Sequence, residues 1–290
     1  MKEDNQWRLE MARQIAPMYA GNPKVAVVAV SGSVGRGWAD RYSDIELDVY
    51  WHAPPTDEDR QQIIRRVDGD IIDYWPLDDE EWSEDYHVRG VQLDLSHFLV
   101  ATIEQYLVDV IEGADTAVLK HLRLAGIHHA VPLHGEELFQ QWRARADHYP
   151  DALVRKVVAE ALNPDVIGVW YLKDVLLARQ DWLMLYDILG RMQRYVLSAL
   201  LGLNRMYLAH PDHKWLKEMT AEMVIKPLDL TRRLEEIWRV EPATAVATLH
   251  AILEETLDLA EQQLPGLDMA RARQAIRRQR HPWDGPSTTE

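Results

Sequence analysis

The sequence contains no cysteine, which excludes disulfide bonds and thiolate metal ligands, so any metal ion must be held by oxygen or imidazole ligands. It also lacks an uninterrupted run of about 18 apolar residues, the length that suggests a membrane-spanning helix. Residues 1–16 are polar and include acids, which does not fit a secretory signal peptide. We therefore expect a cytoplasmic protein with no membrane partner.

Basic residues are fewer than acidic ones. The sequence has 32 lysines and arginines and 47 aspartates and glutamates, which gives a formal net charge of −15. Nucleic-acid backbones are bound by clustered cations, so we do not expect a nucleic-acid partner. The arginines within residues 271–280 run against the overall charge, and we interpret them as the solvated face of a final helix. An acidic surface suits a cationic partner, although it also keeps a protein soluble.

The hydrophobic pattern changes along the 290 residues, a comfortable length for two domains. Trp7, Met11, Ile15 and Met18 recur at helical spacing and predict an amphipathic helix over residues 5–20. Strands are predicted at 24–30, 45–51, 70–75 and 91–99, a helix at 56–67, and a loop or helix start at the acidic residues 78–81. From about residue 102 onward, the spacing of apolar residues is helical.

This organisation predicts an α+β fold. A small domain with a mixed sheet would occupy residues 1–135, and an all-α helical bundle would occupy residues 136–280. The last residues, 281–290, are polar with proline and glycine, and we expect a disordered tail there.

A turn rich in glycine and serine follows the first predicted strand. Gly32 and Ser33 are small enough for the backbone to approach a phosphate group closely, and Arg36 adds a fixed positive charge. The Gly-Lys-Ser/Thr ending of a P-loop is missing, which disfavours P-loop chemistry. The turn on its own is equally well explained as a tight bend of the chain.

Two acids on the next predicted strand make this turn more informative. In an extended segment, residues i and i+2 share a face about 6–7 Å apart, so Asp44 and Glu46 project together. Adjacent carboxylates repel each other unless a cation lies between them, and Mg²⁺ commonly bridges such carboxylates to substrate phosphates. The pattern therefore predicts a site for Mg²⁺ and a nucleoside triphosphate. Asp48 shares the face, and we expect it to be a solvent-facing acid near the strand end.

A third acid is expected if two metal ions are used. Asp94 is the preferred candidate, because it interrupts an otherwise apolar strand, and Asp73 is the alternative.

With these residues in place, the sequence resembles the nucleotidyltransferase superfamily that includes DNA polymerase beta. The family signature is Gly followed by Gly or Ser, a spacer of about a dozen residues, and Asp-hydrophobic-Asp/Glu. Here it reads Gly32-Ser33, ten residues, and Asp44-Ile45-Glu46. The sequence of the motif is most similar to that of bacterial small-molecule adenylyltransferases of the lincosamide and aminoglycoside type, which carry a C-terminal helical domain.

The resemblance implies roles for individual residues. Ser33, with Gly32 and Arg36, would bind the donor phosphates; Asp44, Glu46 and Asp94 would be catalytic and would hold two Mg²⁺ ions. The family tolerates Glu at the second acidic position, so Glu46 is a mild departure, and we expect its extra methylene to affect the metal geometry. In the helical half, Lys214 or Lys217 would contact phosphates, and we select Lys214.

The implied activity is transfer of a nucleoside monophosphate, AMP from ATP or from another triphosphate, to a hydroxyl of a cationic or polyhydroxylated small molecule. A homodimer is compatible with the sequence. Two alternatives stay open: a protein-modifying adenylyltransferase of the kind paired with a toxin partner, and a catalytically silent nucleotide-binding regulatory module.

Overall fold

The computed structural model describes residues 3–78 and 80–282. The chain divides into two compact units, Met1–Pro150 and Asp151–Glu290. The predicted boundary at residue 135 lies earlier and would detach helix α6 (Glu136–Ala146) from the first unit. That helix packs on the sheet of the first unit through Phe139 and Trp142, whose rings lie 6.3 Å and 5.1 Å from the ring of Tyr50. Of the predicted tail, residues 283–290 lie outside the described residues.

A mixed sheet organises the first unit, with its six strands in the order β3-β4-β5-β2-β1-β6. The strands are β1 (Val25–Val30), β2 (Ile45–Trp51), β3 (Asp70–Asp78), β4 (Glu81–Val88), β5 (Val91–Leu99) and β6 (Val131–His134). β2 and β5 pair in parallel, whereas the other neighbours pair antiparallel. This mixed sheet, followed by a helical second unit, confirms the predicted α+β class.

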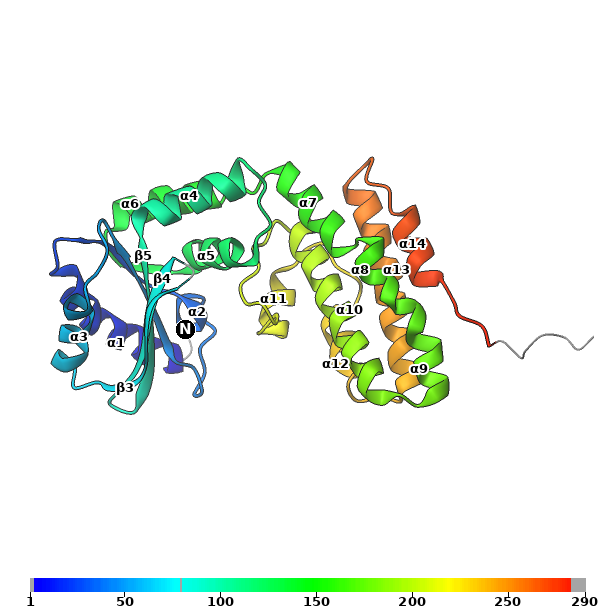
Figure 1. Cartoon of the computed structure of the whole chain (residues 1–290), viewed down its shortest axis with the longest axis horizontal. Coiled ribbons are helices and arrows are strands. Elements are labelled where there is room, and N and C mark those ends of the chain that lie inside the picture. Colours follow the sequence, from blue (N-terminus) through cyan, green and yellow to red (C-terminus); the bar gives the residue numbers. More distant parts are fainter. Residues whose placement is uncertain (1–2, 79, 283–290) are drawn as a thin grey trace, which may run out of the picture. The chain divides into compact units, whose positions relative to one another are not determined.

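Helices cover the two faces of the sheet differently (Figure 1). α1 (Glu3–Ala20) and α3 (Asp57–Arg66) lie on one face, while α4 (Val100–Ile111), α5 (Val118–His129) and α6 lie toward the other. On β2, Ile45, Leu47 and Val49 are fully buried in the core that includes α1 and α3. Because side chains alternate along a strand, Glu46 and Asp48 face the opposite side. The single-turn helix α2 (Gly32–Gly35) follows β1 directly.

Residues 78–81, predicted as a loop or helix start, lie where β3 ends at Asp78 and β4 begins at Glu81, with Glu80 in a turn. The strand β4 that follows was not predicted. The sequence pattern does not reveal β4, because a carboxylate occupies one of its core positions and interrupts the apolar alternation typical of a strand. Glu84 is fully buried, and its charge is matched by Arg60 at 2.6 Å and by His97 at 2.7 Å. Paired in this way, a charged side chain can occupy the core.

The predicted stripe of α1 is confirmed at Ile15, which is buried, and at Met11 and Met18, which are half-buried against the core, but not at Trp7. Trp7 is 41% exposed, whereas Arg8, one residue later, is 2% exposed. The residues that α1 buries are Asn5, Arg8, Leu9, Ala12, Ile15, Ala16 and Tyr19. Arg8 and Asn5 tolerate burial because both donate hydrogen bonds to backbone carbonyls of the first unit.

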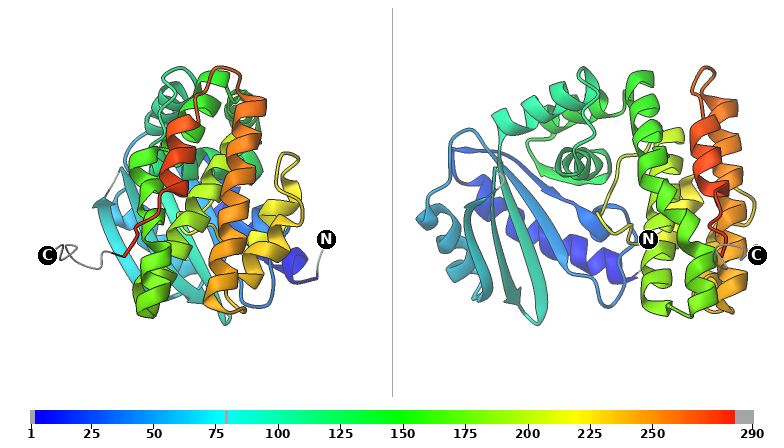
Figure 2. Two further views of the ribbon diagram at one scale, coloured as in Figure 1. Left: turned by 90° about the vertical axis from the view of Figure 1, so that its right-hand side faces the viewer. Right: turned by 45° about the vertical axis from the view of Figure 1, so that its right-hand side comes forward.

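The second unit is helical in its described part. Its helices are α7 (Asp151–Ala161), α8 (Pro164–Ile167), η1 (Gly168–Leu172), α9 (Lys173–Arg179), α10 (Trp182–Leu203), α11 (Leu216–Glu222), α12 (Leu230–Glu236), α13 (Pro242–Gln263) and α14 (Ala270–Arg277). The long helices α10 and α13, yellow-green and orange in Figure 2, run side by side and bury leucines such as Leu189 and Leu253. Across residues 3–78 and 80–282, none of the helices combines the length and apolar character that crossing a bilayer requires.

Candidate functional site

The glycine–serine turn and the acid of β2 are in direct contact. Gly32 has a positive φ of 55°, a conformation that favours glycine. A Cβ atom at this position would lie only 2.0 Å from Oε1 and 2.1 Å from Cδ of Glu46. The carboxyl group of Glu46 therefore rests against the Cα of Gly32. The backbone N–H of Ser31 also donates to the carbonyl of Glu46 at 3.0 Å, which joins the turn to β2.

Strand register places the acids of four strands in one row. Glu46 of β2 pairs with Asp94 of β5, which pairs with Asp85 of β4, which in turn pairs with Asp73 of β3. Directly paired residues project on the same face of a sheet, so these carboxyl groups line up across it. Asp44 lies immediately before β2. Asp94 is thus the direct neighbour of Glu46, whereas Asp73 is three strand spacings away, roughly 14 Å.

The crowding of these acids changes how they hold protons. Burial raises the pKa of Asp94 to about 8, with further contributions from the carboxylates of Asp85, Glu46 and Asp44 and from a hydrogen bond with Asp85. The pKa of Asp85 is also raised, first by burial and then by the charges of Asp73 and Asp44. Such a cluster favours a proton or another cation near its centre, because positive charge relieves the repulsion.

The donor set suits a hard cation, since it consists of carboxylate oxygens alone. In the part of the chain that the structure describes, no three His, Asp or Glu side chains already form a metal-binding group. The side chains of Asp44, Glu46 and Asp94 would therefore have to rotate toward a shared ion. The close approach of Gly32 blocks movement of the Glu46 carboxyl group toward the turn.

Asp48 is not the solvent-facing acid that we expected. Its carboxylate accepts a hydrogen bond from the Tyr50 hydroxyl at 3.3 Å and another from the side chain of Ser31, and Arg123 of α5 lies nearby. Burial raises the pKa of Asp48 to about 6, while the positive charge of Arg123 opposes this rise. α5 and the Ser31 hydroxyl thus enclose this acid, which links β2 to the residue that begins the turn.

The other residues predicted from the sequence have different surroundings. Ser33 is buried, and its carbonyl accepts the N–H groups of Trp38 at 2.9 Å and Ala39 at 3.1 Å. Arg36 donates to the carbonyls of Gly32 at 3.2 Å and Ala125 at 3.5 Å, which ties the turn to α5. Lys214 is exposed and lies between α10 and α11 in the second unit, and its role stays a prediction.

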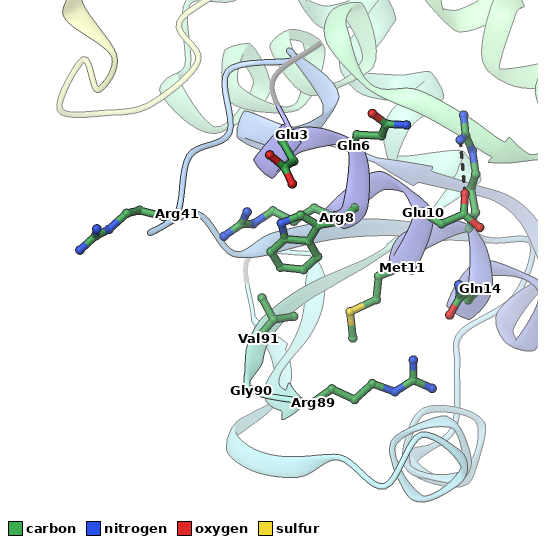
Figure 3. A pocket seen from close by; sticks show the side chains of 12 residues that line it. Glu3, Gln6, Arg8, Glu10, Met11, Gln14, Arg41, Arg89, Gly90 and Val91 are labelled. Atoms are coloured by element: carbon green, nitrogen blue, oxygen red, sulfur yellow. Dashed lines mark ion pairs between the residues drawn. The ribbon is translucent and has the colours of Figure 1, made fainter.

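Arg8 is a residue that the sequence reasoning missed. Its Nε donates to the carbonyl of Ser43 at 2.8 Å, directly before Asp44, and its Nη1 donates to the carbonyl of Asp4 at 2.9 Å. Arg8 also lines a pocket of about 760 Å³ whose other walls include Met11 and Arg89 (Figure 3). Arg8 thus holds the backbone directly before Asp44 in place.

Asp85 was missed for another reason, since it lies on the strand that the sequence did not predict. No local signal in the sequence pairs Asp85 with Asp94. Their pairing depends on the β4–β5 hairpin, which the turn at Arg89-Gly90 closes.

Comparisons with known proteins show distant similarity. Residues 118–216 match the model of a family described as a domain of unknown function (DUF4037), and this segment begins after the acids described above. The search of curated proteins gives no match. Among solved structures, the chain is similar to a nucleotidyltransferase-like protein from Exiguobacterium sibiricum, with a TM-score of 0.44 and 12% identity over 88% of this chain and 78% of that one.

Proposed function

We propose that this protein is a metal-dependent nucleotidyltransferase that moves a nucleoside monophosphate, AMP from ATP in the simplest case, to a hydroxyl of a small-molecule acceptor. The observation that carries this proposal is the contact between Gly32 and the carboxyl group of Glu46, in a register that sets Glu46 beside Asp94. A turn that a phosphate can approach closely and carboxylates from two strands meet on one face of the sheet.

Each of these residues has its own role in the proposed reaction. Gly32 and Ser33 accommodate the donor phosphates, and Asp44, Glu46 and Asp94 hold Mg²⁺, which when bound neutralises charge on the phosphate oxygens. The acceptor oxygen forms a bond to the α-phosphorus while the bond from that phosphorus to the bridging oxygen breaks, so pyrophosphate leaves. Asp94 accepts the proton that the hydroxyl group loses.

We infer a cationic or polyhydroxylated acceptor from the charge that surrounds this site. Asp85 and Asp73 continue the row of acids beyond Asp94, and the whole chain carries a net charge of −15. Carboxylates attract ammonium groups and accept hydrogen bonds from hydroxyl groups. A neutral, purely apolar acceptor would gain nothing from these groups.

Pyrophosphate release tests the proposal. The full chain is incubated with ATP and Mg²⁺ across a library of small hydroxyl-bearing amines and neutral polyols. We expect release with at least one acceptor, and a loss of about 100-fold or more in Asp44→Asn and Glu46→Gln, since each removes a charge from the metal site. Glu112→Gln, which changes an exposed acid at the end of α4, is the matched control and should retain full activity.

Three other results would contradict the proposal in distinct ways. Calorimetric binding of ATP with Mg²⁺, without turnover of any acceptor, would support the silent regulatory module instead. A gain of one nucleotide in the intact mass of a co-expressed protein would support the protein-modifying alternative. Activity that survives in Asp44→Asn and Glu46→Gln would remove these carboxylates from the mechanism.

A further inference from the structure

Trp7 lies on the surface of α1 and lines the pocket of about 760 Å³ shown in Figure 3. The pocket belongs to the first unit and is enclosed by α1, by Arg41 and by the turn between β4 and β5. Pockets of roughly 300–1,000 Å³ are typical of small-molecule sites. The indole is 41% exposed, so a large part of its apolar surface is available to a ligand.

The indole is supported on one face by a fixed cation. The guanidinium carbon of Arg8 lies 4.2 Å from the centre of the Trp7 ring. Arg8 is itself only 2% exposed, and it donates to the carbonyls of Ser43 at 2.8 Å and Asp4 at 2.9 Å. These hydrogen bonds hold the guanidinium in place beneath the ring. The exposed part of the indole therefore lies away from Arg8, where a second flat group can stack on it.

The pocket has an apolar middle and charged ends. Met11 and Val91 line it and are half-buried against the core. In Figure 3, Glu3 and Arg89 lie at opposite ends of the pocket, with Met11 and Val91 between them. A ligand that covers the apolar middle can therefore place a negative charge at Arg89 without approaching Glu3.

Arg89 carries a charge that no acid neutralises. Among the described residues, no carboxylate forms an ion pair with Arg89, and Glu10, another acid of the pocket, is paired with Arg13 at 3.7 Å. Arg89 and Gly90 have positive φ values of 52° and 83°, and a turn of this kind favours Asn, Asp or Gly. The turn therefore does not account for an arginine. In a chain with a net charge of −15, an unpaired cation beside apolar groups is complementary to an anionic ligand.

Docking of a second copy of this chain is the competing explanation, and the composition of the pocket opposes it. Only Trp7, Met11 and Val91 contribute apolar side chains, and the remaining side chains of the lining are charged or polar. Stable protein interfaces bury about 1,200–2,000 Å² around an apolar centre. Three apolar side chains are too few for such a centre, but they are enough to cover one aromatic ring.

We propose that this pocket binds an aromatic anion, with a flat ring stacked on the open face of the Trp7 indole and a carboxylate or phosphate group bound by Arg89. Stacking of flat rings and charge-assisted hydrogen bonds from the guanidinium both favour such a ligand. Neither Glu46 nor Asp94 lines the pocket. The site is therefore independent of the proposed transferase activity.

Binding can be measured at Trp7 itself. The full chain is labelled with 5-fluorotryptophan, and the ¹⁹F resonance of Trp7 is identified by its absence in Trp7→Phe. Two anions are compared with their neutral counterparts in the absence of Mg²⁺: benzoate with benzamide, and AMP with adenosine. We expect at least one anion to shift this resonance about tenfold more than its counterpart at equal concentration, and the more effective anion distinguishes a carboxylate from a phosphate ligand. Equal shifts within both pairs, or no shift with any probe, would overturn the proposal.

Substitutions then test the two parts of the site. Arg89→Gln should raise the dissociation constant of the effective anion about tenfold and leave the shift caused by its neutral counterpart unchanged. Trp7→Ala, measured by calorimetry, should also weaken the anion, because the stacking surface is lost. Arg66→Gln, which changes an exposed arginine of α3 outside the pocket, is the matched control and should bind like the unmodified chain.

Two outcomes would assign the binding elsewhere. Equal weakening in Arg66→Gln and Arg89→Gln would show attraction by the overall charge alone and would remove Arg89 from the site. If AMP is the effective anion, its effect on Trp7 should persist in Asp44→Asn, and loss of that effect would place the nucleotide at the acids of β2 instead.

Discussion

Replacing Gly32 by alanine tests whether the turn and Glu46 depend on each other. A Cβ atom at Gly32 would lie 2.0 Å, 2.1 Å and 2.4 Å from the three heavy atoms of the carboxyl group. Since carbon atoms in contact lie about 3.5 Å apart, that group would have to retreat by roughly 1.5 Å. The end of a glutamate side chain moves easily, so the retreat itself costs little stability. A displacement of about 1 Å in a catalytic group can nevertheless cost roughly 100-fold in rate.

Gly37 supplies the matched control for this substitution. It also has a positive φ, 74°, but a Cβ atom there would meet no atom within 4 Å. Alanine in the left-handed region costs roughly 1–2 kcal/mol at either position. We therefore expect Gly32→Ala and Gly37→Ala to lower the free energy of unfolding similarly in urea titrations, with only Gly32→Ala losing about 100-fold in pyrophosphate release. Rates within tenfold of each other would refute the inferred contact between the turn and Glu46.

Three further predictions concern stability. Arg60→Met should lower the free energy of unfolding by about 3–5 kcal/mol, because it leaves the fully buried Glu84 carboxylate without its guanidinium partner; a cost below about 1 kcal/mol in urea titration would show that the pair is not buried. Burial lowers the pKa of His213 to about 4, so the folded state favours the neutral ring. The resulting stability is present above pH 6.5 and is lost as the pH falls toward 4, by up to about 1.4 kcal/mol per pH unit. His213→Asn should flatten this slope between pH 6.5 and pH 4.5, and an unchanged slope would contradict the assignment. Asp59→Ala should cost about 1 kcal/mol by thermal or urea unfolding, because Asp59 completes the capping box of α3; a neutral effect would argue against the cap.

The parts of the fold that the sequence predicted are those with a strong local pattern. β1 is an apolar run, and on β2 buried Ile45 and Leu47 alternate with Glu46 and Asp48, so both strands and the orientation of the acids were predictable. The spacing between Gly32 and Asp44 then indicated a shared site. The roles predicted for these residues stay predictions, although the structure brings Gly32, Glu46 and Asp94 together.

The parts that could not be predicted depend on partners far away in the sequence. Glu84 occupies a core position only because Arg60 and His97 reach it from α3 and β5, so β4 has no clear apolar alternation of its own. Arg8 is buried because the carbonyl of Ser43, 35 residues later, accepts its hydrogen bond. A pattern of single residues cannot contain these contacts. The row of acids across β2, β5, β4 and β3 was therefore visible only in the folded chain.

The parallel pairing of β2 with β5 aligns residues on both faces of the sheet at once. It sets Glu46 opposite Asp94 and, on the reverse side, sets Ile45 opposite Leu93 and Leu47 opposite Leu95, all four of them fully buried. Sliding β5 by a single residue would press a carboxylate into the hydrophobic interior and expose leucine where an acid belongs. Selection for a well-packed interior therefore also preserves the alignment of the two carboxylates. Mutations that loosen the packing beneath these strands should therefore also displace Glu46 and Asp94 from each other.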